Sequence, residues 1–224
     1  KPRKKTAAKD ATKLDAKFRG DHLSWVAFAL VIVGVTILVY TSGFKLQDVE
    51  KLAQKSEIMQ ADGTPTIGGP FTLVNQAGKT VTDKNFRGQY LMIYFGYTYC
   101  PDVCPTALNE IAEVMEKLGA KAAKVQPLFI TVDPERDTPE RMAEFVGAFD
   151  PRITGLTGTL DQIKASTKSF KVYYAKAVQK EAPDGYTMEH TTSLYLIDPK
   201  GRFVRPYSYN ATVNENADDL QARL

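Results

Sequence analysis

The sequence predicts an α/β domain built on a mixed β-sheet flanked by helices, preceded by one transmembrane helix. Continuous apolar runs, typical of buried strands, alternate with stretches in which apolar residues recur at helical spacing. The alternation ends in a hairpin and a closing helix, which make the sheet mixed. A long uncharged apolar segment lies near the N-terminus. With 224 residues, 43% hydrophobic and 25% charged, the chain has room for one globular domain and a substantial appendage.

The apolar segment runs over residues 23–40 (LSWVAFALVIVGVTILVY) and contains no charged residue. At about 1.5 Å per residue it covers roughly the ~30 Å hydrocarbon core of a bilayer. Trp25 and Tyr40 fall near its two ends, where amphipathic rings are preferred. A cleaved signal peptide has a shorter apolar region followed by a small-residue cleavage site, whereas YTSGFKL follows here. We therefore predict a retained membrane anchor over residues 22–44.

The segment before the anchor, residues 1–21, carries eight Lys or Arg against three Asp, although the formal net charge of the whole chain is only +3. Nucleic-acid binding is one interpretation of such a cluster, but a basic stretch beside a membrane helix is typical of a topological signal. We therefore expect no nucleic-acid partner. The basic tail is expected in the matrix or cytoplasm, and the globular part in the intermembrane space or periplasm. The tail, together with a first residue other than Met, favours the mitochondrial inner membrane over a bacterial inner membrane.

The soluble part divides into a juxtamembrane linker over residues 45–67, which contains GTPTIGGP, and a domain over residues 68–224. The first elements expected in the domain are a hairpin of residues 71–74 and 79–82 across NQAG, a buried strand over residues 90–95 (YLMIYF), a helix with one apolar face after the cysteines, and a buried strand over residues 125–132 (VQPLFITV).

A second helix is expected to begin at DTPE, with an Asp or Thr cap and a proline in its first turn, and we interpret Asp137 as that cap. The elements expected after it are a helix over residues 160–170, a strand over residues 171–178, a turn at EAPDGY, a hairpin of residues 193–197 and 201–207, and a closing helix over residues 216–224.

The two cysteines of the chain, Cys100 and Cys104, lie in YTYCPDVCPT between a strand and a helix. The unpaired N–H groups and the dipole of a helix N-terminus both lower a thiol pKa, so thiolate is expected to form more easily at this site. Three interpretations follow: small buried residues, a redox dithiol, or a soft metal site. Redox pairs usually have two intervening residues; three also allow both sulfurs to point at one metal.

A third ligand is available only from two histidines. His22 lies at the predicted membrane edge and is interpreted as interfacial. His190 lies in TMEHTT, in a loop just before the buried strand SLYLI. In a thioredoxin-like arrangement this loop faces the cysteine loop, so His190 is the candidate ligand. Two thiolates and an imidazole suit Cu(I), and zinc or Cu(II) would also accept them.

Other side chains are expected near this site. Asp133 follows the strand of residues 125–132 at the same sheet edge, where it would orient His190, contact copper weakly, or cap a turn. Tyr97 and Tyr99 are expected to shield the site, and Met188 to pack in the core. The segment HTTS lacks the proline that thioredoxin-type oxidoreductases carry there, which favours metal binding over general disulfide exchange.

Several segments together resemble the Sco/SenC family of copper chaperones. These segments are GYTYCPDVCP, DPERDTP, EHTTSLYLIDPKGRF, GGPFTL at residues 68–73 and FRGQY at residues 86–90. The resemblance covers about residue 66 to the C-terminus. It implies a thioredoxin-like fold with added hairpins and copper binding through Cys100, Cys104 and His190. It also implies assistance in assembling the CuA site of cytochrome c oxidase subunit II, and in eukaryotes a place in the mitochondrial inner membrane.

The expected function is that of a membrane-anchored copper metallochaperone, not an enzyme, with subunit II and a soluble copper donor protein as partners. The alternative is a thiol–disulfide oxidoreductase that keeps the CuA cysteines of subunit II reduced, with Cys100 and Cys104 as its redox pair. A peroxiredoxin-like peroxidase, suggested by FRGQYLMIYF, ranks last. Such peroxidases place a single catalytic cysteine after a threonine and a proline, and this loop does not.

Overall fold

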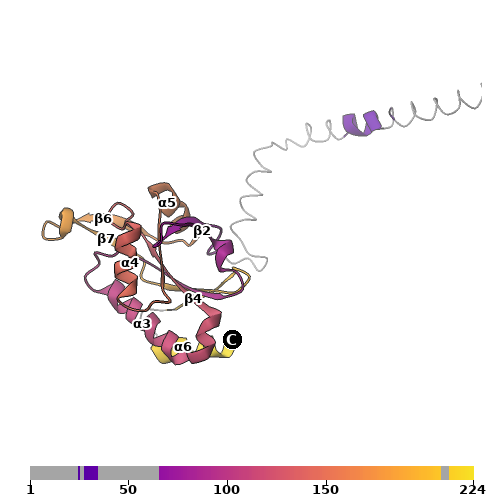
Figure 1. Cartoon of the computed structure of the whole chain (residues 1–224). Coiled ribbons are helices and arrows are strands. Elements are labelled where there is room, and N and C mark those ends of the chain that lie inside the picture. Colours follow the sequence, from indigo (N-terminus) through magenta and orange to yellow (C-terminus); the bar gives the residue numbers. More distant parts are fainter. Residues whose placement is uncertain (1–24, 26–27, 35–65, 208–211) are drawn as a thin grey trace, which may run out of the picture. The chain divides into compact units, whose positions relative to one another are not determined.

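The computed structural model describes residues 25, 28–34, 66–207 and 212–224 (Figure 1). The basic tail, most of the predicted anchor and most of the linker lie outside the described residues. The described part of the anchor is helical. None of the helices that the structure describes has both the length and the apolar character needed to cross a bilayer.

A seven-stranded mixed sheet forms the centre of the domain (Figure 1). Its strands, in spatial order, are β2 (Thr80–Thr82), β1 (Thr72–Asn75), β5 (Thr154–Thr157), β4 (Val125–Thr131), β3 (Tyr90–Gly96), β8 (Leu194–Ile197) and β9 (Phe203–Tyr207). The three central strands β3, β4 and β5 are parallel, and every other neighbour pairs antiparallel. Nearly all side chains of β3 and β4 are buried, so both faces of the sheet are covered there.

Four helices surround this sheet within the described part of the domain: α3 (Val103–Leu118), α4 (Pro139–Gly147), α5 (Leu160–Ser169) and α6 (Val213–Arg223). Short 3-10 segments lie at Asp83–Phe86, Gly119–Lys124 and Pro183–Gly185. Helix α3 packs against α6, α4 against β5, and α5 against β1. Together these layers form a thioredoxin-like α/β fold, as the sequence predicts.

The pairing of β3 with β4 positions the functional residues. The two strands run parallel from the Tyr90–Val125 pair to the Gly96–Thr131 pair. Their carboxyl ends therefore lie at one edge of the sheet. The cysteine loop leaves β3 at this edge, and the segment that contains Asp133 leaves β4 beside it.

A separate hairpin is added to the core. Strands β6 (Tyr174–Val178) and β7 (Tyr186–His190) pair antiparallel with each other and form their own two-stranded sheet. Figure 1 shows this hairpin extending away from the body of the domain. His190 ends β7 and pairs with Tyr174.

The predicted first hairpin, the strands of residues 90–95 and 125–132, and the hairpin across DPKG are confirmed. The strand expected over residues 171–178 begins only at Tyr174, because the chain leaves α5 through Lys171 in the left-handed region (φ 57°). His190 was expected in a loop, and it lies instead in a strand. Strand β5 was not expected. Helix α6 starts at Val213, before the expected residue 216, because a capping box of Thr212 and Glu215 begins it there.

Candidate metal centre

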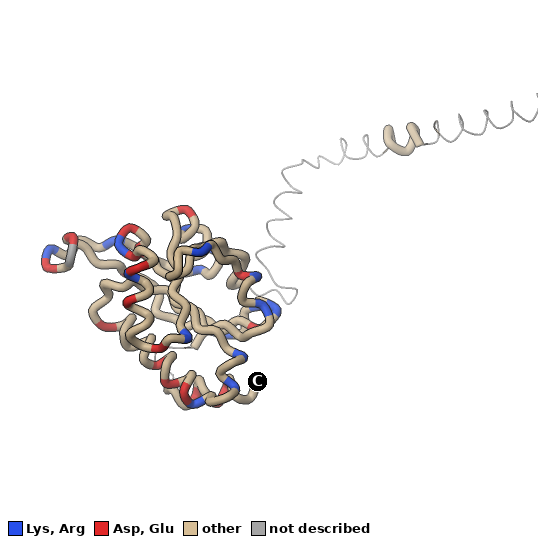
Figure 2. The backbone as a smooth tube through the Cα atoms, viewed as in Figure 1, with Lys and Arg blue, Asp and Glu red and all other residues tan. Residues whose placement is uncertain are grey.

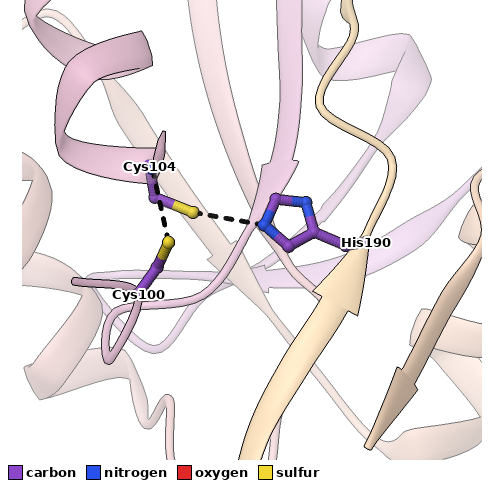
Figure 3. Close-up of side chains that lie close together, drawn as sticks. All are labelled: Cys100, Cys104 and His190. Atoms are coloured by element: carbon purple, nitrogen blue, oxygen red, sulfur yellow. Dashed lines mark hydrogen bonds between the residues drawn. The ribbon is translucent and has the colours of Figure 1, made fainter. Parts of the chain in front are cut away.

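The two cysteines lie on either side of the start of α3. Cys100 belongs to the loop between β3 and α3, and Cys104 is the second residue of the helix. Both are free thiols, and Cys104 is fully buried. The backbone N–H of Cys104 donates to Cys100 Sγ at 3.4 Å, so an otherwise unpaired N–H of the helix start serves the first sulfur (Figure 3).

The imidazole of His190 reaches this pair from the hairpin. Its Nε2 lies 3.5 Å from Cys104 Sγ (Figure 3). Its Nδ1 lies 3.0 Å from the carbonyl oxygen of Thr191. A carbonyl oxygen only accepts, so Nδ1 carries a proton, and Nε2 is the ring nitrogen that faces the sulfurs. The rings of Tyr94 and Tyr97 pack edge-on against the imidazole, with centroids 6.1 and 5.8 Å away.

The three donor atoms converge on one point. Cys100 Sγ, Cys104 Sγ and a ring nitrogen of His190 all lie within 4.8 Å of one another. Across the part of the chain that the structure describes, this is the sole group of three or more His, Cys, Asp or Glu side chains placed to hold a metal ion. The donors are two soft sulfurs and one imidazole nitrogen, the set that thiophilic metals such as Cu(I) and zinc prefer.

The two thiols differ in acidity. A hydrogen bond from Cys104 is the main cause that lowers the pKa of Cys100 to about 4, and His190 and backbone N–H groups add to it. Burial raises the pKa of Cys104 well above its ordinary value. The expected ease of thiolate formation therefore applies to Cys100, whereas burial outweighs the helix start at Cys104. The metal-free pair carries one negative charge, and a metal cation must displace the proton of Cys104.

Asp133 lies near the site without reaching the imidazole. Its buried carboxylate accepts a hydrogen bond from Arg136 Nε at 2.5 Å and one from the Tyr186 hydroxyl at 3.0 Å. Orienting His190 was one of the roles considered for Asp133, but the hydrogen-bond partner of His190 Nδ1 is the carbonyl oxygen of Thr191. The structure thus brings Cys100, Cys104 and His190 together and leaves Asp133 outside them.

Asp137 does not cap α4, contrary to prediction. Thr138 is the cap, and its hydroxyl accepts from the N–H of Arg141. The carboxylate of Asp137 is fully buried and accepts hydrogen bonds from the N–H and hydroxyl of Thr98 at 3.0 and 2.6 Å and from the hydroxyl of Thr131 at 2.5 Å. It therefore ties the cysteine loop to the end of β4, and its burial raises its pKa.

The other expected neighbours lie as follows. Tyr97 and Met188 are buried in the core, whereas Tyr99 is half-buried under the guanidinium groups of Arg136 and Arg141. No cis peptide bond occurs in the described chain, in line with the missing proline. His22 lies outside the described residues.

Two residues that the sequence analysis did not single out support the site. A Cβ at Gly96 would lie 2.7 Å from Cys104 Sγ, so only glycine lets the sulfur approach β3 this closely. Arg136 contacts both Asp133 and Tyr186. The apolar run YLMIYFG ending in glycine at the cysteine loop was a signal for Gly96; DPERD contained no comparable signal for Arg136.

A thioredoxin-like domain with two thiols and an imidazole converging at the strand ends defines a class of proteins that bind soft metals or exchange thiols. A family model described as SCO1/SenC matches residues 59–224. The chain belongs to the SCO1/SenC family.

Individual relatives agree with this assignment. The chain is 38% identical over 205 residues to the mitochondrial SCO1 homologue of Mus musculus, covering 90% of this chain and 71% of that protein. It is 36% identical over 207 residues to SCO1 homologue 1 of Arabidopsis thaliana, covering 90% of this chain and 61% of that protein. The chain thus spans less than two thirds of the plant relative. It is also 42% identical over 149 residues to a SCO2-like protein of Rickettsia prowazekii, covering 66% of this chain and 73% of that protein.

Solved structures show the same fold. The copper-bound structure of ScoI from Bradyrhizobium japonicum shares 49% identity with a TM-score of 0.66, covering 70% of this chain and 99% of that one. Copper-bound yeast Sco1 shares 37% identity with a TM-score of 0.65, covering 70% of this chain and 88% of that one.

Proposed function

We propose that this protein is a copper metallochaperone that holds Cu(I) between Cys100 Sγ, Cys104 Sγ and His190 Nε2. The observation that carries the proposal is the convergence of these three atoms within 4.8 Å. Relatives of 49% and 37% identity are described with copper bound, and a third solved relative, BsSco, is described as a member of the Sco family of cytochrome c oxidase assembly proteins.

The geometry suits a carrier. Cu(I) replaces the proton of Cys104, so loading releases one proton and leaves the single negative charge of the pair unchanged. Three ligands leave one side of the ion open to an incoming thiolate. Copper can then pass through shared-ligand intermediates to the CuA cysteines of cytochrome c oxidase subunit II. We propose that subunit II is the acceptor and a soluble protein the copper donor.

Anaerobic titration of the reduced protein with Cu(I) tests this function. The expected result is one tightly bound ion per chain, with affinity falling steeply in Cys100→Ser, Cys104→Ser and His190→Ala. His22→Ala, which changes the other histidine of the chain, is the matched control and should bind like the wild type. Full affinity in Cys104→Ser would overturn the proposal.

A thiol–disulfide reductase is the second candidate, and the low pKa of Cys100 favours it. In this reaction the Cys100 thiolate attacks a disulfide of subunit II and forms a mixed disulfide. Cys104 then displaces the target sulfur, so the target gains two thiols and this chain is left with a Cys100–Cys104 disulfide. Reduction of an oxidised subunit II domain at equal rates by wild type and His190→Ala, with no copper requirement, would establish this activity.

The arrangement of the whole chain is part of the proposal. Residues 1–21 form a basic tail in the matrix, residues 22–44 cross the mitochondrial inner membrane, residues 45–67 are a linker, and residues 68–224 place the site in the intermembrane space; a bacterial inner membrane facing the periplasm is the alternative. The uncharged apolar run and the basic excess before it support this topology. A protease-protection assay on intact organelles tests it. A domain that stays protected after the outer membrane is opened, with the inner membrane kept closed, would contradict it.

Asp133 lies outside the ligand set in this proposal. It supports the site through Arg136 and Tyr186, the two residues it contacts.

A further inference from the structure

His190 is delivered by an element that the central sheet does not hold. Strands β6 and β7 pair only with each other among the described strands, whereas the cysteine loop follows directly from the core strand β3. No strand ladder therefore fixes the imidazole relative to the two sulfurs. The position of His190 depends on the contacts that dock the hairpin and on residues 191–193, which lead into the core strand β8.

Arg136 makes the central docking contacts. Its guanidinium carbon lies 3.8 Å from the centroid of the Tyr186 ring, and its Nη1 donates to the Tyr186 carbonyl oxygen at 3.3 Å. Its Nε donates to Asp133 at 2.5 Å, and the Tyr186 hydroxyl donates to the same carboxylate. The guanidinium also lies over Tyr99 of the cysteine loop, with the ring centroid 4.8 Å away. One cation thus joins the hairpin, the segment after β4 and the cysteine loop.

The burial of this cluster makes it a specific contact. The side chain of Arg136 is only 7% exposed and that of Asp133 only 1%. A buried ion pair contributes little net stability, but removing one partner is strongly destabilising because it leaves the other charge buried without compensation. The hairpin supplies the Tyr186 ring and carbonyl oxygen that contact the guanidinium. Undocking the hairpin would therefore remove both contacts from a buried cation. The planar, multi-donor guanidinium satisfies stacking and hydrogen bonding at once, which lysine cannot do.

Two neighbouring contacts act in the same direction. The Tyr97 hydroxyl lies 2.6 Å from the Thr187 hydroxyl, which joins the cysteine loop to β7. At the outer side Lys176 of β6 pairs with Glu135, and its ammonium lies 4.5 Å from the Tyr186 ring centroid. Lys176 and Glu135 are about half exposed, so their ion pair contributes much less to docking of the hairpin than the buried pair of Arg136 and Asp133.

We propose that Arg136 and Tyr186 are positioning residues that dock the β6–β7 hairpin and thereby hold His190 at the two sulfurs. This inference rests on the proposed copper site. It means that these two residues determine whether Cu(I) is bound by three ligands or by the two thiolates alone. Neither residue touches the metal. Loss of the contacts between Arg136 and Tyr186 would release the imidazole and leave Cu(I) bound by the two thiolates.

The first arm of the test needs no copper. Hydrogen exchange, measured by mass spectrometry on the reduced metal-free chain, should show at least about tenfold faster exchange of β7 amides in Arg136→Met and Tyr186→Leu. Exchange in β4 should stay unchanged. Tyr186→Phe keeps the ring and should exchange nearly as slowly as the wild type. Arg152→Met, which removes an arginine paired with Asp150 outside the site, is the matched control.

The second arm measures Cu(I). Changes around metal ligands typically cost about 10–100-fold in affinity, and we expect a loss in this range for Arg136→Met, with X-ray absorption reporting two-coordinate instead of three-coordinate copper. In the His190→Ala background the same substitution should change affinity less than about twofold, because the ligand it positions is gone.

The two arms separate the possible failures. Unchanged hydrogen exchange of β7 in both Arg136→Met and Tyr186→Leu overturns the proposed docking role, whatever the copper measurements show. So does an equal loss of affinity with and without His190, which would show a general structural effect. A wild-type chain that binds no Cu(I) would instead overturn the proposed function. If Arg136→Met fails to unfold cooperatively, Tyr186→Leu on the partly exposed hairpin decides the result.

Discussion

Gly96 ends β3 directly beneath the sulfur of Cys104. A Cβ built there would lie 2.7 Å from that sulfur and 2.8 Å from the ring of Phe129, both closer than side chains normally approach. We predict that Gly96→Ala costs about 1–3 kcal/mol of stability through overpacking. Displacement of the sulfur should also weaken Cu(I) binding by about tenfold or more.

Chemical denaturation and a competitive Cu(I) titration measure these two effects. Gly147→Ala is the matched control, because nothing lies within 4 Å of a Cβ at that position of α4. It should leave copper binding unchanged and stabilise the helix by up to about 1 kcal/mol. Wild-type copper affinity in Gly96→Ala would show that the sulfur has more freedom than the structure gives it.

The acidity of Cys100 leads to a second prediction at this scale. Its pKa of about 4 means that the thiol loses its proton as pH rises through that value, so the thiolate is present throughout the neutral range. Far-ultraviolet thiolate absorbance of the reduced metal-free protein should report close to one thiolate per chain between about pH 6 and 8. The signal should disappear in Cys100→Ser.

Cys104→Ala tests the cause of this low pKa. The hydrogen bond from Cys104 is the largest influence on Cys100, so the pKa of Cys100 should rise towards the ordinary value of about 8.5 when it is removed. A wild-type titration already centred near the ordinary thiol value would contradict the structure.

The candidate metal ligands could be predicted from the sequence, but the residues that hold them in place could not. Two cysteines three apart and a lone histidine before a buried strand are chemically distinctive. The role of Asp137 depends on Thr98 and Thr131, residues far apart in sequence that meet only when β3 and β4 pair. A local capping pattern therefore gave the wrong role.

Among the elements, the turn that joins β4 to α4 depends on that same buried carboxylate. Asp137→Ala would leave the N–H of Thr98 and two hydroxyls without their acceptor. We predict a loss of about 2–4 kcal/mol, because buried donors without partners are costly. Asp137→Asn keeps one acceptor oxygen and should cost clearly less. Urea unfolding of the reduced metal-free protein measures both.

Asp161→Ala is the control for this series. Asp161 is an exposed residue of the first turn of α5, and its removal should cost less than about 1 kcal/mol. Equal losses at the two positions would show that the Asp137 network does not hold the loop.

Elements with strong local patterns were predictable, and elements defined by their partners were not. The run YLMIYF has no plausible alternative to a buried strand. Strand β5 has only four residues (TGLT), and its glycine is packed against Met142 of α4. Strand β7 has only five residues, of which Met188 alone is buried, so its extent could not be read from polarity.

At the scale of the whole molecule, the alternation of strands and helices predicted the fold class, but it could not give the strand order. Placing β1 next to β5 rather than β3 requires contacts across the entire domain. This strand order assigns the candidate ligands to different elements: the central parallel strands position the cysteine loop, and the added hairpin positions His190.

Because all three donor atoms belong to one compact unit, Ile58–Leu224, copper should stabilise that unit as a whole. A ligand that binds only the folded state contributes about 2.7 kcal/mol at a free concentration one hundred times its Kd. For a domain of this size that free energy corresponds to a rise in Tm of roughly 5–10 °C. Calorimetry of the reduced chain, with Cu(I) buffered at that concentration and then removed by a chelator, measures the shift. Cys100→Ser and Cys104→Ser should show almost none of it, and Asp161→Ala all of it. A shift of the same size in the cysteine variants would place the stabilising copper somewhere other than between Cys100, Cys104 and His190.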